Sequence, residues 1–201
     1  MARRSRTAAT AFPMVQGTGY LSGQMLIAMP SLQSPSFAQT VICLVAHSAE
    51  GAMGIVVNKP LETLSFDDLL KQLDLSPRPP QRRLPMFQGG PVEGGRGFVL
   101  HTADWSSDQS LPVGGEFALT ASVDILKAVA GGGGPRQGML ALGYAGWGPG
   151  QLEEEIQANA WLSVPPDEEL LFGGDDARKW RAALAKLKID PLLLSDAAGH
   201  A

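Results

Sequence analysis

Apolar and polar residues alternate in short blocks along this chain, and its most apolar stretch lies within residues 40–60. Two β-branched runs, residues 41–46 and 55–57, flank a polar segment that contains glycine. Short runs of this composition are typical of buried strands. We therefore expect a strand pair joined by a turn, with His47 leaving the first strand and Asn58 leaving the second.

Four further apolar runs predict strands. They are residues 24–29, 96–101, 139–142 and 161–164, and a polar loop is expected over residues 102–111. Proline follows the first and last of these runs, and proline cannot donate a hydrogen bond to a β-ladder. Two glycine-rich motifs, residues 87–91 and 143–147, are predicted to be bends at strand ends.

Helix boundaries are indicated between these runs. Ser65 is a predicted helix cap followed by carboxylates, and Thr120 is predicted to cap a second helix that four glycines, residues 131–134, bring to an end. Residues 151–159 form a third predicted helix, and Asp175 begins the last one. The residues expected to face the core are Leu69, Leu70, Leu73, Val123, Leu126, Val129, Trp180, Leu184 and Leu187.

The order of these elements predicts an α+β fold. Strands and helices do not alternate in strict βαβ order, and neither an internal repeat nor a second core is visible. We expect a single compact domain over residues 19–201 that contains a mixed sheet. Residues 1–18, which include Arg3, Arg4 and Arg6, are predicted to be a flexible basic tail.

Composition narrows the class of protein. Among 201 residues, 44% are hydrophobic and 18% charged, which is typical of a globular protein, and 24 glycines with 15 prolines favour strands and turns. A net charge of −4 argues against a general nucleic-acid coat, so direct DNA binding is not expected. The chain contains neither an apolar run of about eighteen residues nor a secretory signal, so we expect a cytoplasmic location without membrane association.

The single cysteine, Cys43, lies four residues before His47, which raises the question of a thiol–imidazole pair. Residues four apart on a strand are separated by about 13 Å, beyond hydrogen-bond reach. Cys43 also lies within an apolar run, where burial makes a thiol inert. We expect a core cysteine; thiol-based sensing requires this strand to be an exposed edge.

His47 and His101 each end an apolar run, and with Glu50 or Asp104 they form the nearest approach to a metal site in the sequence. Neither HxxxH nor CxxC spacing is present, so no metal and no cofactor is predicted, and the histidines are expected to fix turns. The Gly89-Gly90 pair lacks the accompanying residues of a phosphate-binding loop. Tyr144 and Trp147 fit either a stacking platform or a core corner.

Charge is unevenly distributed near the end of the chain. Residues 151–176 contain eight acids and no base, whereas residues 178–188 contain five bases and no acid. Solvated helix faces account for this pattern most simply. The alternative is an acidic patch that binds a basic partner.

Several motifs, in order, resemble the YqgE/AlgH family from about Tyr20 to the end of the chain. They are residues 26–30, His47 with residues 50–54, residues 58–60, 89–91, 96–101, 143–147, 150–153, 159–162 and 199–201. The resemblance implies one compact α+β domain with a coiled, mainly antiparallel sheet and peripheral helices. It implies no established reaction; the family is usually labelled a transcriptional regulator, in connection with alginate production.

This chain departs from the family pattern at three positions. Ser34 and Ala46 stand where the family commonly has carboxylates, and Val45 stands where a cysteine is often found. The resemblance therefore implies no role for a carboxylate or a cysteine at these positions.

Two functions are compatible with the residues. The first is a non-enzymatic regulatory or interaction protein that acts indirectly, through a protein partner, with its binding surface on loops at strand ends. The second is a small-molecule-binding protein or enzyme that uses His47 or His101 as acid or base and Arg96 as an anion anchor. The candidate surface for either consists of His47, Glu50, Asn58, Lys59, Gly89, Gly90, Arg96, His101, Tyr144 and Trp147.

Overall fold

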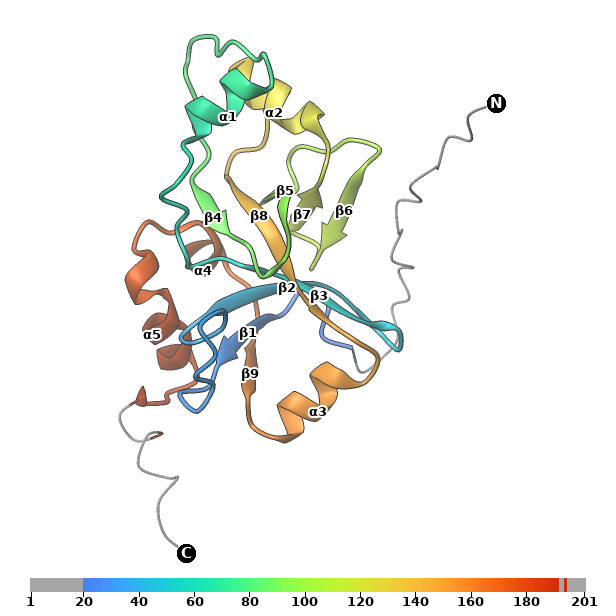
Figure 1. Ribbon diagram of the computed structural model, residues 1–201, viewed down its shortest axis with the longest axis vertical. Coiled ribbons are helices and arrows are strands. Elements are labelled where there is room, and N and C mark those ends of the chain that lie inside the picture. Colours follow the sequence, from blue (N-terminus) through green and yellow to red (C-terminus); the bar gives the residue numbers. More distant parts are fainter. Residues whose placement is uncertain (1–19, 192–193, 195–201) are drawn as a thin grey trace, which may run out of the picture.

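A computed structural model of the chain describes residues 20–191 and 194 (Figure 1). The predicted basic tail, residues 1–18, and the closing residues 199–201 lie outside this part. The described strands are β1 (Met25–Ala28), β2 (Val41–Ser48), β3 (Gly51–Val56), β4 (Met86–Gln88), β5 (Val92–Thr102), β6 (Ser110–Val113), β7 (Phe117–Thr120), β8 (Gly138–Trp147) and β9 (Trp161–Val164). The described helices are α1 (Phe66–Gln72), α2 (Val123–Ala130), α3 (Gln151–Gln157), α4 (Glu168–Phe172) and α5 (Asp176–Lys186).

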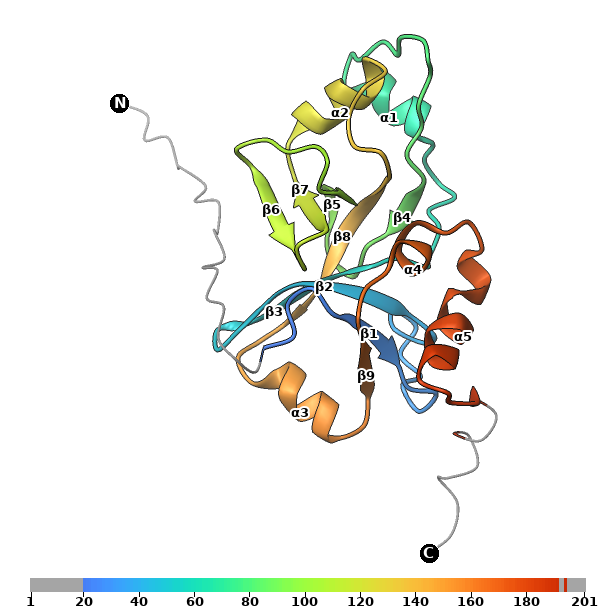
Figure 2. The same cartoon turned by 180° about the vertical axis from the view of Figure 1, so that it is seen from behind.

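The strands form one curled sheet in the order β6-β7-β5-β8-β3-β2-β1-β9, and β4 pairs with β8 outside this path. The β4–β8 pair is parallel, whereas the neighbours along the path are antiparallel. Seen from behind, α1 and α2 lie at one end of the molecule and α3 at the other, with α4 and α5 beside β1 and β2 (Figure 2). The predicted α+β class and the mixed, mainly antiparallel sheet are confirmed.

Strand β8 joins the two halves of the sheet. Residues 138–142 and Tyr144 pair with β5, whereas residues 145–147 pair with β3. The strand changes direction at Gly143, whose φ is +74° and where an added Cβ would lie 2.5 Å from the carbonyl oxygen of Gly90. Residues 143–147 are therefore part of a long bent strand, and their prediction as a loop-like bend after the strand was wrong.

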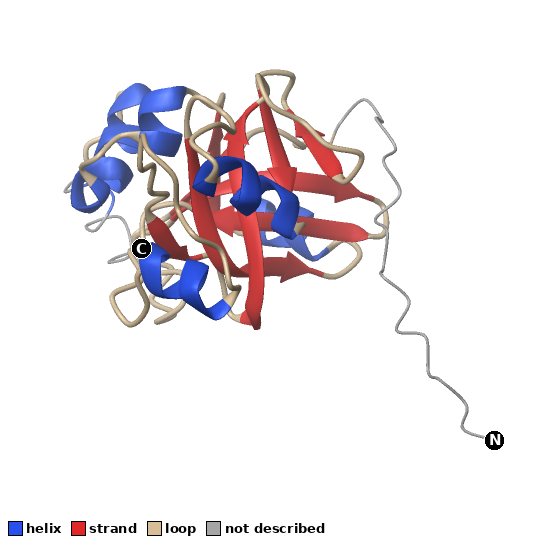
Figure 3. Cartoon of the chain, turned by 90° about the horizontal axis from the view of Figure 1, so that it is seen from above, coloured by secondary structure: helices blue, strands red, loops and turns tan. Residues whose placement is uncertain are grey.

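Side chains from the two halves of the sheet meet in a central core. Alternate residues of β1 and β2, such as Met25, Cys43 and Val45, face this core, while Leu26 and Leu44 face an outer cluster beneath α3. On the other half, Val99 and Leu140 face α1 and α2. Figure 3 shows helices on the outside of crossing strands. Because both faces of β1, β2 and β3 are covered, these strands are apolar over most of their length, whereas residues 93–97 of β5 are exposed.

The helix predictions were correct in place but not at every boundary residue. Ser65 caps α1 by accepting a hydrogen bond from the backbone N–H of Asp68, at 3.2 Å. Thr120 is the last residue of β7, and Ser122 is the N-cap of α2, so the predicted cap was wrong. Leu73, Val123 and Leu187 are exposed because each lies at a helix end, where the chain turns away from the core-facing stripe.

Three elements were absent from the prediction. Strands β6 and β7 form a hairpin in a region interpreted as a polar loop and a helix cap, and α4 precedes the predicted last helix. The hairpin turn contains Gly114 and Gly115, both with positive φ. Two short apolar runs separated by a glycine-containing turn are a recognised hairpin signal, so this element could have been found.

Candidate functional site

The ten predicted surface residues occupy several places in the fold. Arg96 and Tyr144 line the same cleft, and His47 and Trp147 both contact α3. Glu50 is exposed in the turn between β2 and β3. The remaining residues make contacts that hold neighbouring segments together.

His47 is a buried connector between the beginning of the described chain and α3. Its Nδ1 accepts the backbone N–H of Leu21 at 3.0 Å, so Nε2 carries the proton and donates to Oε1 of Glu153 at 3.0 Å. The His47 side chain is 2% exposed. With both ring nitrogens occupied, the imidazole acts as a structural group.

His101 is fully buried between β5 and β7. Its Nδ1 lies 2.9 Å from the carbonyl oxygen of Thr102, and its Nε2 lies 2.9 Å from Oγ1 of Thr120. Burial lowers the pKa of His101, against smaller opposing effects of the Thr102 carbonyl and the Asp104 carboxylate. The neutral imidazole is thus the favoured form.

Asn58 and Lys59 fix the loop before β2. The Asn58 side-chain amide accepts the N–H of Val41 and donates to the carbonyl of Gln39, both at 2.8 Å. Nζ of Lys59 donates to the carbonyl of Pro35 at 2.8 Å. These side chains satisfy backbone groups that the sheet leaves unpaired.

Gly89 and Gly90 permit a close backbone approach to β8. An added Cβ would lie 2.2 Å from the carbonyl oxygen of Gly143 at Gly89, and 2.1 Å from the carbonyl carbon of Tyr144 at Gly90. Gly90 also has a φ of +152°. The glycines are therefore required by packing between protein segments.

Glu155 of α3 binds two indole groups. Its Oε2 accepts Nε1–H of Trp147 at 2.9 Å and Nε1–H of Trp161 at 2.8 Å. The two indole rings are 5.8 Å apart in a T-shaped arrangement. Trp147 is 7% exposed and packs in the outer cluster beneath α3, which identifies it as a core residue.

Much of the acidic segment, residues 151–176, is engaged within the fold. Beyond Glu153 and Glu155, Glu168 pairs with Arg136, and Asp167 caps α4 and pairs with Lys186. Asp176 lies 2.9 Å from Nζ of Lys179. Several of these carboxylates therefore form contacts within the fold and are not simply part of solvated helix faces.

Cys43 lies in the central core, with no exposed surface. Burial raises its pKa to about 12. The expected core cysteine is thereby confirmed.

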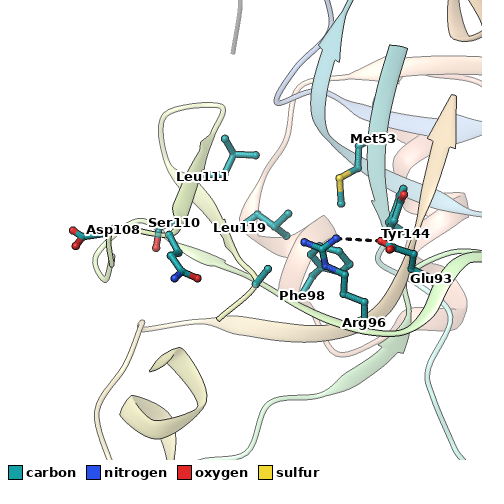
Figure 4. Close-up of a pocket in the computed structure, with 11 residues that line it drawn as sticks. Met53, Glu93, Arg96, Phe98, Asp108, Ser110, Leu111, Leu119 and Tyr144 are labelled. Atoms are coloured by element: carbon teal, nitrogen blue, oxygen red, sulfur yellow. Dashed lines mark hydrogen bonds and ion pairs between the residues drawn. The ribbon is translucent and has the colours of Figure 1, made fainter. Parts of the chain in front are cut away.

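A cleft lies between β5, the β6–β7 hairpin and residues of β3 and β8 (Figure 4). We call it the Arg96 cleft; its volume is about 470 Å³. Its apolar lining consists of Met53, Phe98, Leu111, Leu119, Ala121 and Tyr144. Its polar lining consists of Glu93, Arg96, Asp108, Gln109 and Ser110.

Arg96 already has partners within the cleft. Its guanidinium lies 3.2 Å from the carboxylate of Glu93 and stands over the ring of Phe98, 5.1 Å from the centroid. Phe98 in turn contacts Tyr144 edge-on, with ring centroids 5.9 Å apart. The cleft therefore presents an aromatic surface next to an ion pair that has no net charge. Such a lining suits a partly apolar ligand better than an anion.

Sequence reasoning identified two of the eleven lining residues, Arg96 and Tyr144. Met53 lay in the predicted turn between residues 46 and 55, and Phe98 lay in a predicted strand. Asp108 and Ser110 lay in the predicted polar loop, and Leu119 was assigned to no element. Recognition of the β6–β7 hairpin would have paired Ser110 and Leu111 with Thr120 and Leu119 of β7, but only the folded sheet shows that β7 lies beside β5.

Two general findings concern the described residues. No helix among them is long and apolar enough to cross a membrane. In that same part of the chain, no group of three or more histidine, cysteine, aspartate or glutamate side chains is arranged to hold a metal ion.

Comparison with known proteins gives consistent relatives. A UPF0301 protein of Rhodopseudomonas palustris (strain HaA2) is 51% identical over 207 residues, covering 99% of this chain and 94% of that protein. A UPF0301 protein of Azorhizobium caulinodans is 54% identical over 190 residues, covering 90% of this chain and 93% of that protein.

Solved structures share the fold. The solution structure of the AlgH protein from Pseudomonas aeruginosa matches with a TM-score of 0.72 at 43% identity, over 94% of this chain and 100% of that one. The crystal structure of a Corynebacterium diphtheriae protein matches with a TM-score of 0.66 at 20% identity, over 90% and 94% of the two chains, and shows a likeness of fold alone.

A family model described as AlgH-like matches residues 25–192. This match covers the sheet and all five described helices, and it confirms the resemblance drawn from the motifs. The chain belongs to the AlgH-like family.

Proposed function

We propose that this chain is a non-enzymatic regulatory protein of the cytoplasm that acts through a protein partner, and that the Arg96 cleft binds this partner. The observation that supports the proposal is the character of the cleft, which combines an aromatic and aliphatic lining with a charged rim. Apolar clefts with a few polar groups are typical binding sites, and a volume of about 470 Å³ accommodates a few side chains of a partner segment. Of the candidate surface, Arg96 and Tyr144 belong to this site.

The contacts of the histidines disfavour the alternative of an enzyme built on His47, Arg96 and His101. The imidazoles of His47 and His101 are buried, and each uses its two ring nitrogens in hydrogen bonds. Of His47, Arg96 and His101, all of which the structure describes, Arg96 alone lines the cleft. A general acid or base has to reach the proton that it transfers. We therefore give the binding function precedence.

Regulation through a protein partner is also favoured over direct DNA binding. The net charge is −4, and several carboxylates of residues 151–176 remain at the molecular surface. Nuclear magnetic resonance titration with a short DNA duplex tests this point. Shifts limited to Arg3, Arg4 and Arg6 that vanish at moderate salt are expected; saturable shifts at His47, Asn58 and Trp147 that survive salt would overturn it.

Site-specific photocrosslinking in cells tests the binding site. A photoreactive residue at Leu111 in the cleft is compared with one at Val123, which is 42% exposed on α2. We expect one protein to be crosslinked from position 111 and not from position 123. This product should be lost when Ala121→Arg places a large cationic side chain at an exposed position of the cleft lining. Equal products from both positions, or none from position 111, would contradict the proposal.

A further inference from the structure

A chain of hydrogen bonds connects the buried imidazole of His101 with the wall of the Arg96 cleft. Nε2 of His101 lies 2.9 Å from Oγ1 of Thr120, which lies 2.7 Å from Oγ of Ser110. His101 and Thr120 have no exposed surface, whereas Ser110 is partly exposed and lines the cleft. The chain therefore runs from the protein interior to the binding site.

The direction of every hydrogen bond in this chain follows from its inner end. A carbonyl oxygen can only accept, so the bond between His101 Nδ1 and the Thr102 carbonyl requires the proton on Nδ1. Nε2 of a neutral imidazole must then accept the hydroxyl proton of Thr120. Since Thr120 has one hydroxyl proton, Ser110 must donate its own proton to Thr120.

Ser110 consequently presents an oxygen that accepts hydrogen bonds. One lone pair receives the backbone N–H of Ser107 at 2.9 Å. The other faces the Ser107 hydroxyl at 3.4 Å, which is longer than the usual hydroxyl hydrogen bond of about 2.8 Å. The Ser107 oxygen is held by the backbone N–H of Gln109 at 3.3 Å, but its hydroxyl proton can turn away from Ser110 and leave this lone pair to a stronger donor from a ligand.

The charged side chains of the cleft add to this preference for donors. Arg96 and Glu93 neutralise each other at 3.2 Å. Asp108, next but one to Ser110 in the chain, makes no hydrogen bond or ion pair with any other described residue. Figure 4 shows Asp108 and Ser110 on the side of the cleft away from Arg96 and Tyr144. That side is thus negative and rich in acceptors.

We propose that the Arg96 cleft selects a lysine or arginine side chain of the partner, carried between apolar residues. The ammonium or guanidinium group donates to Ser110 Oγ and to the Asp108 carboxylate, and the neighbouring apolar residues cover Met53, Phe98 and Leu119. Ser110 is the specificity-determining residue, and His101 and Thr120 position its proton. This inference rests on the proposed function, because it names the chemistry of the segment that the cleft binds.

Three capped peptides that differ at one residue test the inference: acetyl-Ala-Leu-Lys-Leu-Ala-amide and its Gln and Glu counterparts. Each is titrated into the whole protein while amide resonances of residues 108–111 and Leu119 are followed. We expect the Lys peptide to bind roughly tenfold more tightly than the Gln peptide, since it makes charge-assisted hydrogen bonds. Equal affinities, or tighter binding of the Glu peptide, would overturn the selectivity.

Substitutions separate the contributions of Ser110 and Asp108 to the preference for a basic side chain. Ser110→Ala removes the acceptor and Asp108→Asn removes the charge, and each should reduce the preference for Lys over Gln several-fold. Asp124→Asn, on the exposed surface of α2, is the matched control and should leave it unchanged. Thr120→Val removes the partner to which Ser110 donates, so the Ser110 hydroxyl becomes free to donate and the preference for Lys over Gln should decrease. The amide spectrum of the Thr120→Val protein must first show the native fold. If it does not, Ser110→Ala alone tests the role of Ser110.

The two proposals fail in different ways. Tighter binding of the Glu peptide with shifts at the same amides would refute the choice of a basic side chain and leave a binding cleft. If no peptide shifts these amides at about 5 mM, where even weak binding is visible, the inference is wrong. In that case the crosslinking experiment at Leu111 still decides the proposed function, because it depends on the partner alone.

Discussion

Nζ of Lys179 on α5 lies 3.0 Å from the carbonyl oxygen of Val57, which precedes it by 122 residues. The same ammonium group donates to the carbonyl of Leu171 at 3.2 Å and pairs with Asp176 at 2.9 Å. Lys179 is 4% exposed and also stands over the ring of Phe87. One buried cation thus fastens the C-terminal helices to the end of the central strands.

Replacement of Lys179 by methionine should destabilise the fold. Methionine fills a similar volume but leaves two carbonyl groups and a carboxylate without their donor, so the free energy of unfolding should fall by roughly 2–4 kcal/mol. Denaturant titration measures this loss. Lys186→Met removes a 44% exposed partner of Asp167 and should cost less than about 1 kcal/mol; equal losses in both variants would contradict the assignment.

Glu155→Ala should weaken the packing beneath α3. Two buried indole N–H groups lose their acceptor, and the free energy of unfolding should fall by about 2 kcal/mol. The Nε1–H resonances of Trp147 and Trp161 should both move in proton–nitrogen spectra. Glu154→Ala, at the preceding position of the same helix, should change neither quantity much. A similar effect of both substitutions would show that the loss of a carboxylate near the N-terminus of α3 is responsible.

His101 should make stability depend on pH. Its pKa in the folded protein is lowered, chiefly by burial, so the unfolded chain takes up a proton first as pH falls. Its contribution is therefore fully present above the ordinary histidine pKa of about 6.5 and is lost as pH falls toward the folded value. Between pH 7.5 and 5.5, the free energy of unfolding should decrease more steeply for the wild type than for His101→Gln.

The difference between the two slopes cannot exceed about 1.4 kcal/mol per pH unit, the value for one proton. Groups other than His101 titrate in both proteins and cancel in the comparison. Parallel curves for wild type and variant would show that His101 is not the group that titrates.

Cys43 should be unreactive in the native protein. Its pKa is raised to about 12 and its side chain has no exposed surface, so almost no accessible thiolate exists at neutral pH. An aromatic disulfide reagent should label it only on the timescale of unfolding, and labelling should accelerate with denaturant. Rapid stoichiometric labelling without denaturant would show an opening of β2 and would restore thiol sensing as a possibility.

The sequence by itself determined the types of most elements. The apolar runs around Cys43, Phe98 and Trp161 are strands, and Ser65 and Asp175 cap helices as their local chemistry requires. The ordered motifs also identified the family. These features depend on residues close together in the chain, so local patterns contain them.

Tertiary structure decided what those elements do. His47 is held by Glu153, 106 residues later, and Lys179 by Val57, and no local pattern specifies such partners. The two-residue period of a strand shows that its faces differ, but not which element covers each face. The Arg96 cleft exists because β8 bends at Gly143 and the β6–β7 hairpin comes to lie beside β5, bringing Ser110 near Phe98 and Tyr144. Only the folded chain creates that proximity.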